Sequence, residues 1–247
     1  MLTEQRFEVI LKELREKGSV TVAELTRLLG TSESTIRRDL NTLDEEGKLT
    51  KVFGGAVALD TTFSSVELSV SQKSGVNVPE KQRIAEYAST LVEPDDLVFI
   101  DAGTTTEYII DYLKEKRAVY VTNAVSHARK LSVAGFKVEL IGGELKAITE
   151  AVVGSRAIIS LQRFNFNKGF FGTNGISIQN GLTTPDVNEA LVKETAFKRS
   201  LNRYVLADNG KFGKVSSVTF AGIKDCTIIT DKKPEEKYAD NTRVIIV

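Results

Sequence analysis

The chain contains one cysteine and one histidine in 247 residues. A single cysteine excludes a disulfide within the chain and a metal cluster built from cysteines. A metal site built from several histidines is excluded as well, and a Ser-His hydrolytic triad would have to use His127. We therefore expect no metal site.

Long apolar runs and a net charge are also missing. No apolar stretch approaches the roughly 20 residues of a membrane-spanning helix, and MLTEQRFEVI carries an acidic residue where a secretory signal would carry basic ones. The 33 Lys and Arg residues balance 33 Asp and Glu residues, so the total charge gives no argument for a polyanionic partner. We expect a cytoplasmic protein without a membrane partner.

The first 46 residues predict three short helices. Apolar residues recur at helical spacing from Gln5 to Leu14, and Gly18 ends this first helix. A second helix follows Thr21, which is placed to form a capping box with Glu24. A third helix is predicted from about residue 33 to 46, and the three together match a helix-turn-helix unit.

The sequence KLTKVFGGAVAL comes next and alternates apolar and polar residues around two glycines, which predicts a two-stranded wing. We therefore assign residues 1–58 to a winged helix-turn-helix domain. Residues 59–80 are rich in Ser and Thr and show no periodic pattern, which predicts a linker.

Residues 81–247 alternate short β-branched runs with amphipathic helices. The runs that predict strands are DLVFI, AVYVT, KVELI, KGFFGT, NRYVLAD, CTIIT and RVIIV. The fold class predicted for this part is α/β, a doubly wound and mostly parallel sheet covered by helices. Ligands of such sheets bind outside the carboxyl ends of the strands.

The stretch TSESTIRRDL opens the third predicted helix. In a helix-turn-helix this helix enters the major groove, where arginine can fork onto guanine and hydroxyls can reach phosphates or bases. An Arg pair on a helix can equally be solvated. Residues 1–56 carry nine basic against ten acidic residues, so the argument for DNA binding comes from where the basic residues lie and not from how many there are. The candidate DNA contacts are Ser32, Ser34, Thr35, Arg37, Arg38 and the wing lysines Lys48 and Lys51.

The spacing from Arg6 through Ile10 to SESTIRRDLNTLDEEGKL and the GGA of the wing resembles the N-terminal signature of the DeoR family of bacterial transcriptional regulators. The resemblance implies that DNA is contacted by Ser34, Thr35, Arg37 and Arg38. It also implies that Asp39 braces the helix. The chain departs from the family at Phe53, where a histidine commonly precedes the two glycines. The resemblance therefore gives no support for a wing contact at this position.

In the C-terminal part, FIDAGTTTEYI places Asp101 at the end of a strand and Gly103 with three threonines at the start of a helix. Backbone amides and hydroxyls at a helix start can cradle a phosphate, although a Thr-rich helix cap would have the same sequence. The segment is neither a dinucleotide-binding fingerprint nor a P-loop, which argues against NAD and ATP. We expect no cofactor.

Polar or glycine-rich segments also follow other strands, namely VTNAV, LIGGEL, GTNGI, LTTPDVNEALVK and LADNGKFG. Each is common by itself, but the series indicates one cleft that reads sugar hydroxyls and a phosphate. The candidate effector-binding residues are Lys81, Arg83, Asp101, Gly103, Thr104, Thr105, Thr106, Thr122, Asn123, Gly142, Gly143, Asn174, Asp186, Lys193 and Lys211. We assign Asp101 to sugar hydroxyls and Lys211 to the phosphate charge, and we expect His127 on a helix surface.

This ordered set resembles the effector domain of the DeoR family, which is related in fold to ribose-5-phosphate isomerase and glucosamine-6-phosphate deaminase. KGFFGTNGI together with TTPDVNEALVK looks most like the fructose-operon repressors of the family, which implies a sugar phosphate effector and first of all fructose 1-phosphate. Those enzymes carry catalytic acids near the segment GTNGI, whereas Thr173 and Asn174 are neutral, so we expect binding without turnover.

The resemblance implies a repressor of a sugar uptake and metabolism operon. Its partners would be double-stranded operator DNA, a sugar phosphate and further copies of the chain in a dimer or tetramer. Two alternatives remain: Asp186 or Glu189 could act as a base in an isomerase or deaminase joined to a DNA-binding domain, or the helix-turn-helix could contact protein.

Overall fold

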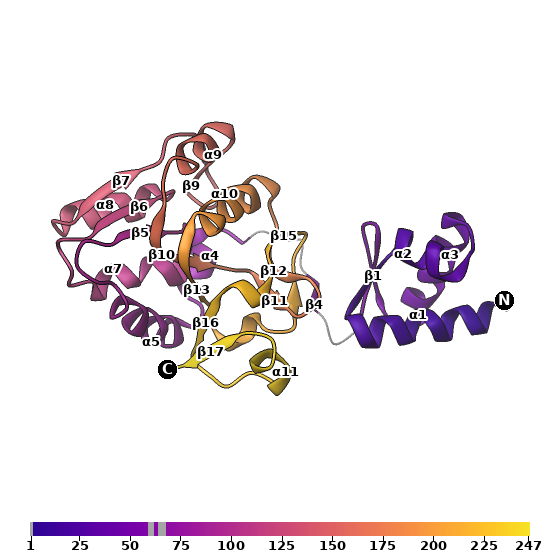
Figure 1. The fold of residues 1–247 in the computed structure, drawn as a ribbon. Coiled ribbons are helices and arrows are strands. Elements are labelled where there is room, and N and C mark those ends of the chain that lie inside the picture. The colour runs from indigo at the N-terminus through magenta and orange to yellow at the C-terminus, as the bar shows by residue number, and fades with distance from the viewer. Residues whose placement is uncertain (1, 59–61, 64–67) are drawn as a thin grey trace.

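The computed structural model describes residues 2–58, 62–63 and 68–247. Parts of the predicted linker, residues 59–61 and 64–67, lie outside the described residues. Figure 1 shows a small N-terminal body, coloured indigo to violet, and a larger C-terminal body, coloured magenta to yellow. Among the described residues, no helix has the length and apolar composition needed to cross a membrane.

The N-terminal body is a winged helix-turn-helix, as predicted. Its helices are α1 (Thr3–Lys17), α2 (Val22–Leu29) and α3 (Glu33–Glu45), and its antiparallel sheet has the order β1 (Ser19–Thr21), β3 (Gly55–Val57), β2 (Thr50–Val52). The two predicted wing strands are β2 and β3, and β1 is a third strand that was not predicted. The predicted capping box of α2 is confirmed: the Thr21 hydroxyl accepts from the Glu24 amide at 3.1 Å, and the Glu24 carboxylate accepts from the Thr21 amide at 2.8 Å.

An ion pair joins α3 to α1. The Arg6 guanidinium donates to both carboxylate oxygens of Asp39, at 2.7 and 3.0 Å, and Asp39 is 3% exposed. This pair holds the helix that carries the two arginines against the first helix. The prediction that Asp39 braces the helix is confirmed.

The C-terminal body is built on a seven-stranded sheet of order β17-β16-β13-β10-β5-β6-β7, in which all the pairings are parallel. Its strands are β5 (Leu97–Ile100), β6 (Val119–Thr122), β7 (Lys137–Leu140), β10 (Phe166–Gly172), β13 (Ser200–Leu206), β16 (Thr227–Thr230) and β17 (Arg243–Ile246). These are the seven strands that the apolar runs predicted. The order of the strands reverses between β5 and β10, so the sheet has a topological switch point there.

Helices cover both faces of this sheet (Figure 1). On one face pack α5 (Val78–Ser89), α7 (Ile109–Tyr112) and α8 (Val125–Val133), and on the other pack α9 (Ser155–Leu161) and α10 (Val187–Lys198). Shorter helices that follow α5 in the chain are α6 (Thr104–Glu107), α11 (Glu236–Ala239) and the 3-10 turns η1 (Asn209–Lys211) and η2 (Ile223–Asp225). The doubly wound α/β architecture is therefore confirmed.

Several short elements were not predicted. Two small antiparallel sheets contain β8 (Glu144–Lys146) with β9 (Ala151–Val153), and β11 (Gly175–Ser177) with β12 (Gly181–Thr184) and β15 (Val218–Ala221). In the stretch predicted as a linker, β4 (Thr62–Phe63) pairs in parallel with β14 (Lys214–Val215), and α4 (Val70–Ser74) precedes α5. The second half of that stretch is therefore folded onto the C-terminal body.

The single histidine lies in the interior, so the expectation of a surface position is wrong. His127 on α8 is 2% exposed, because this face of the helix packs toward the sheet. Burial, with a smaller contribution from Lys130, lowers the pKa of its imidazole to about 3, and a hydrogen bond with the Gly103 backbone opposes the shift. The imidazole is therefore neutral at neutral pH.

The buried histidine predicts a pH dependence of stability. The unfolded chain takes up a proton on this imidazole near the ordinary histidine pKa of 6.5, but the folded chain does not until about pH 3, so stability falls as the pH drops between these values. We expect the free energy of unfolding to fall more steeply from about pH 7 to about pH 5 in the wild type than in His127→Gln, by at most about 1.4 kcal/mol per pH unit. Urea unfolding at several pH values measures this, and equal slopes would contradict it.

A second prediction concerns the wing. A Cβ atom at Gly55 would lie 2.1 Å from the backbone oxygen of Val20 on the adjacent strand, and only a backbone shift can relieve this contact. We expect Gly55→Ala to lower the unfolding temperature of the N-terminal domain, at a cost of about 1–3 kcal/mol or more. The control is Gly47→Ala, a position with open space but φ +66°, where the cost is about 1 kcal/mol. Thermal unfolding followed by circular dichroism should rank the two variants in this order.

Candidate functional site

One candidate site is the exposed start of α3. The Ser32 hydroxyl caps the helix by accepting from the Thr35 amide at 3.3 Å, and it also lies 2.8 Å from the Ser34 hydroxyl. Arg37 and Arg38 follow on the exposed part of the helix. Arg37 pairs with Glu33 one turn earlier at 3.2 Å, whereas Arg38 makes no ion pair within the part of the chain that the structure describes.

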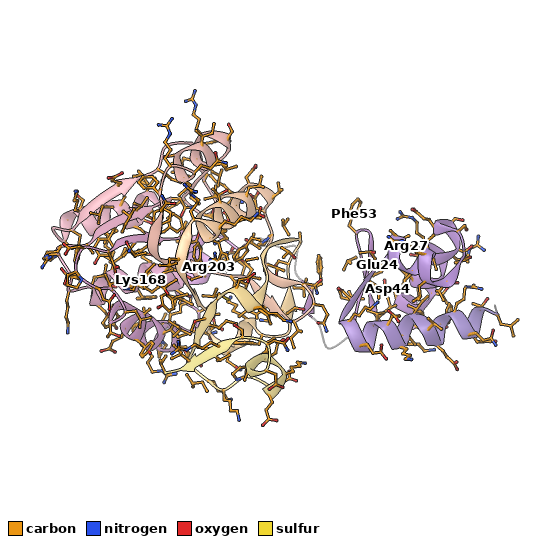
Figure 2. The ribbon with its side chains drawn as sticks, in the orientation of Figure 1. Glu24, Arg27, Asp44, Phe53, Lys168 and Arg203 are labelled. Carbon is orange, nitrogen blue, oxygen red and sulfur yellow. The ribbon has the colours of Figure 1, made fainter. Side chains whose placement is uncertain are left out.

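The wing carries the other predicted DNA contacts. Lys48 is exposed and lies 2.8 Å from Glu46, and Lys51 is exposed while its amide donates to Asp44 at 2.9 Å. At the tip of the hairpin the ring of Phe53 is fully exposed and points away from the domain (Figure 2). The seven predicted DNA-binding residues therefore lie on the exposed helix and wing, and their contacts with DNA remain a prediction.

The other candidate site is a cavity of about 120 Å³ at the switch point of the sheet, beyond the carboxyl ends of β5 and β10. Of the predicted effector-binding residues, the cavity is lined by Lys81, Gly103, Thr104, Thr105, Asn174, Lys193 and Lys211. It is also lined by Leu68, Val70, Lys73, Val76, Ala102, Thr149, Gly172, Thr173, Glu189 and Asp208. The fold thus brings together side chains from separate segments of the sequence.

Lysines gather at one end of this cavity. The Lys81 ammonium is 4% exposed and donates to the Thr104 hydroxyl at 3.0 Å and to the Lys73 carbonyl at 2.5 Å. Burial lowers the pKa of Lys81, and the nearby charges of Lys211 and Lys73 lower it further, while Asp208 opposes the shift. A buried ammonium beside two others is stabilised by an anion, so this end of the cavity suits a phosphate.

The helix that follows the loop predicted to cradle a phosphate is short. This helix, α6, has four residues and ends at Glu107, and α7 begins at Ile109. It is therefore too short to provide a substantial helix dipole. The Thr106 hydroxyl donates to the carbonyls of Asp101, at 2.6 Å, and Gly103, at 2.8 Å, and is therefore occupied inside the loop. Positive charge at this loop comes from the lysines instead.

Asp101 and Lys193 form an ion pair below the cavity. Both are nearly fully buried, their charged groups are in contact, and the Gly172 amide donates to Asp101 at 3.0 Å. Burial raises the pKa of Asp101, and the Lys193 charge opposes that shift. Lys193 lines the cavity and Asp101 lies behind it, so the predicted contact of Asp101 with sugar hydroxyls remains a prediction.

Glu189 also lines the cavity; it is 8% exposed and accepts from the Thr149 hydroxyl. Lys146 lies 3.4 Å from Glu189 and 3.1 Å from Asp186. Asp186 does not line the cavity but caps α10, accepting from the Glu189 amide at 2.8 Å. Although burial opposes the shift, this bond and Lys146 lower the pKa of Asp186.

The other predicted effector residues lie outside the cavity lining. Arg83 is exposed on α5, and the Asn123 side chain accepts from the Ala102 amide at 2.9 Å, which holds the loop after β5. The Thr122 hydroxyl accepts from the Ala124 amide at 3.1 Å. Gly142 and Gly143 belong to the connection between β7 and β8. Direct contact of these residues with a ligand stays a prediction. The hydrogen bonds of Asn123 and Thr122 hold the loops after β5 and β6 in position.

Sequence analysis missed the cavity residues of α4 and its flanks, because residues 59–80 show no apolar period. A local signal for this helix is nevertheless present. The Ser69 hydroxyl accepts from the Gln72 amide at 3.3 Å and the Gln72 side chain accepts from the Ser69 amide at 2.9 Å, which is a capping box. Ser-x-x-Gln in the sequence would have predicted a helix start there.

Comparison with known proteins agrees with this two-part architecture. The DeoR-like helix-turn-helix domain matches residues 6–62, and the DeoR C terminal sensor domain matches residues 76–232. The uncharacterized HTH-type transcriptional regulator FruR of Bacillus subtilis (strain 168) is 42% identical, covering 100% of this chain and 99% of its own. The lactose phosphotransferase system repressor of Staphylococcus aureus (strain NCTC 8325 / PS 47) is 34% identical over 94% of each chain.

Solved structures with a similar fold are more distant. Ribose 5-phosphate isomerase from Plasmodium falciparum is 14% identical, with a TM-score of 0.40 over 53% of this chain and 52% of its own. The sorbitol operon regulator SorC from Klebsiella pneumoniae is 13% identical, with a TM-score of 0.38 over 84% of this chain and 90% of its own. The two domain matches and the full-length relatives establish the family: the chain belongs to the DeoR family of transcriptional regulators.

Proposed function

We propose that this regulator represses a sugar uptake and metabolism operon and that a sugar phosphate in the cavity releases it from operator DNA. The observation that carries the proposal is the lysine cluster at the switch-point cavity, in a chain that also presents two arginines on the exposed start of α3. The two functions lie in different domains, so the effector must act through a conformational equilibrium.

The charges in the cavity support a phosphorylated sugar. Lys193 is paired with Asp101 and Glu189 with Lys146. The lining also contains two further lysines, Lys81 and Lys211, and one acid, Asp208. A phosphate monoester carries a charge of about −1.5 to −2 near neutral pH, which complements this excess. The carboxylate of Glu189 and the amide of Asn174, which line the same cavity, can bind sugar hydroxyls.

The proposed effector is fructose 1-phosphate, with other sugar phosphates as alternatives. Its support is the sequence combination KGFFGTNGI with TTPDVNEALVK, together with the relative FruR. The lactose phosphotransferase system repressors support control by sugar metabolism in general. We also propose a dimer or tetramer, because the nearly neutral N-terminal domain offers few phosphate contacts per copy.

The arrangement of acids speaks against the enzymatic alternative. A general base needs a free carboxylate, but Asp186 caps α10 and both it and Glu189 lie beside Lys146. Thr173 is occupied as well, since its hydroxyl donates to the Gly175 carbonyl at 2.8 Å. The cavity is therefore better suited to binding than to proton abstraction.

The proposed DNA contacts of α3 can be tested by substitution. We expect Arg38→Ala to weaken binding to operator DNA by about 1–3 kcal/mol. Arg37→Ala should cost less, because the wild-type side chain must first leave Glu33. Fluorescence anisotropy with DNA from upstream of the chain's own gene measures both affinities. Arg163→Ala, an exposed arginine in the C-terminal domain, is the control, and unchanged binding in both α3 variants would refute this use of the arginines.

The proposed effector can be tested by its effect on thermal stability. In a thermal-shift panel of sugar phosphates, fructose 1-phosphate at 100 times its dissociation constant should stabilise the folded state by about 2.7 kcal/mol. Lys211→Met should reduce this shift, and fructose without phosphate should give a much smaller one. The absence of a shift with fructose 1-phosphate would remove this effector assignment. Multiple turnover of any sugar phosphate in the same mixtures would contradict a role limited to sensing.

A further inference from the structure

Strands β11 and β12 form a hairpin whose base lines the cavity. Thr173 and Asn174 directly precede β11 and belong to the cavity lining. The Thr173 hydroxyl donates to the Thr183 carbonyl of β12 at 3.1 Å, and the Asn174 amide donates to the same carbonyl at 2.9 Å. The hairpin is thus closed beside the cavity, so a ligand that fills the cavity would contact its base directly.

The tip of the same hairpin contacts the DNA-binding domain. The Asn180 side chain accepts from the Ser19 hydroxyl at 2.9 Å, and the Gln179 side chain donates to the Glu16 carbonyl at 3.2 Å. Both partners lie where α1 ends and β1 begins. Figure 1 shows β11 and β12 on the side of the C-terminal body that faces the N-terminal body. The tip, residues 178–180, is therefore in contact with both bodies of the chain.

The contact holds elements that determine how the DNA-binding domain is oriented. Ser19 of β1 pairs with Val57 of the wing strand β3. Helix α1 is joined to α3 by the ion pair between Arg6 and Asp39. A contact at the junction of α1 and β1 therefore fixes the direction in which the wing and α3 face. The start of α3 stays exposed in this arrangement, so docking leaves it free to bind DNA.

Close packing makes the hairpin a rigid unit. Every residue of β11 and β12 is buried. A Cβ atom at Gly175, where β11 begins, would lie 2.3 Å from the backbone oxygen of Lys214. A Cβ atom at Gly181, where β12 begins, would lie 2.2 Å from the backbone oxygen of Ala221. Closely packed interiors transmit strain, so a shift at the base of the hairpin reaches its tip.

The Asn174 side chain gives a ligand a way to act on the base. Its amide oxygen accepts from the Thr184 hydroxyl at the end of β12, at 3.3 Å. A sugar hydroxyl that bound this amide would compete with Thr184 and change the contact between the two ends of the hairpin. Binding of the sugar and a shift of the hairpin are therefore linked at one side chain.

The strength of the contact at the tip is compatible with a switch. It includes two hydrogen bonds between uncharged groups, one partly buried and one exposed. Each such bond shifts an equilibrium about 2- to 10-fold. Allosteric coupling typically changes an affinity about 5- to 150-fold, so two bonds supply a coupling of ordinary size. A ligand of moderate affinity can therefore break them.

We propose that the tip of the hairpin is the docking surface for the DNA-binding domain of the same chain, that the docked orientation is the one that binds operator DNA, and that ligand contact at the base weakens the docking. The proposal rests on the proposed function and assigns the route by which the sugar phosphate acts. The hairpin is then the element whose position both the ligand and the operator influence.

Substitutions on both sides of the contact test the docking. In fluorescence anisotropy with operator DNA, Ser19→Ala and Asn180→Ala should each weaken binding of the full-length chain about 2- to 10-fold, because each removes the same hydrogen bond. The double variant should be no weaker than either single variant, since both act through one contact. Ser19→Thr, which keeps the hydroxyl, and the exposed control Gln162→Ala should bind as the wild type does.

The response to ligand should change in the same variants. The factor by which saturating fructose 1-phosphate lowers operator affinity should shrink about 2- to 10-fold in Asn180→Ala, because the ligand has one bond fewer to break. This residue lies in the C-terminal body, so the loss does not come from damage to the DNA-binding domain. Unchanged or tighter operator binding by Asn180→Ala, or additive losses in the double variant, would overturn the proposal.

Cross-linking measures the docking directly. Glu16→Cys combined with Gln179→Cys brings two thiols together for a short bifunctional thiol reagent and leaves the bond between Ser19 and Asn180 intact. Cys226 reacts little, because burial raises the pKa of its thiol to about 12. We expect a cross-link within single chains, identified by mass spectrometry, with a severalfold lower yield in saturating fructose 1-phosphate.

The control for cross-linking pairs the same Glu16→Cys with Gln162→Cys, an exposed position at the end of α9, and should give no cross-link. Equal yields from the two pairs would overturn the docking. A yield at the hairpin tip that fructose 1-phosphate leaves unchanged, with binding confirmed by calorimetry, would overturn the coupling of ligand to docking.

The outcomes separate this inference from the proposed function. If fructose 1-phosphate releases the wild type from operator DNA and Asn180→Ala matches the wild type in affinity and release, the docking fails and the proposed function stands. If no sugar phosphate releases the wild type, the proposed function fails and the coupling fails with it. The affinities and cross-linking yields measured without ligand then still decide whether the tip docks the DNA-binding domain.

Discussion

The cavity depends on one buried ion pair, between Asp101 at the end of β5 and Lys193 on α10. The strand order reverses between the adjacent strands β5 and β10, and Asp101 joins their ends, since it also accepts from the Gly172 amide at the end of β10. Buried charges are costly to desolvate, and here the cost is offset by mutual attraction and by the amide bond. Because the two charges of the pair offset each other, the net charge of the cavity is set by the other charged residues of its lining.

The other lysines of the lining are Lys81, Lys211 and Lys73 of α4, and the lining also holds the carboxylate of Glu189 and the amide of Asn174. Cationic, acidic and amide groups therefore meet in one cavity at the switch point. Helix α4, which belongs to the segment that leads from the DNA-binding domain, supplies part of the cavity wall.

Elements with a local signal in the sequence were predicted, and elements that form only by pairing with residues distant in the sequence were missed. The seven sheet strands are apolar runs and the second helix has its capping box, so both were predictable. Strands such as β8 and β11 have three residues and form by pairing with segments whose register no local pattern specifies. Within the site, Asp186 caps α10 and lies outside the cavity lining, which the sequence does not reveal because a helix cap and a ligand-binding carboxylate have the same sequence. Its contact with a ligand stays a prediction. Burial of His127 depends on which face α8 turns to the sheet, which a single polar residue does not reveal.

The N-terminal domain is nearly neutral, since residues 1–56 carry nine basic against ten acidic residues. Arg37 and Lys48 are paired with acids on their own segments, so each of these bonds must be exchanged before the side chain can contact a phosphate or a base. Such an exchange reduces the net gain of the new contact. The positions of the arginines and lysines on the exposed helix and wing therefore matter more for DNA binding than the total charge of the domain.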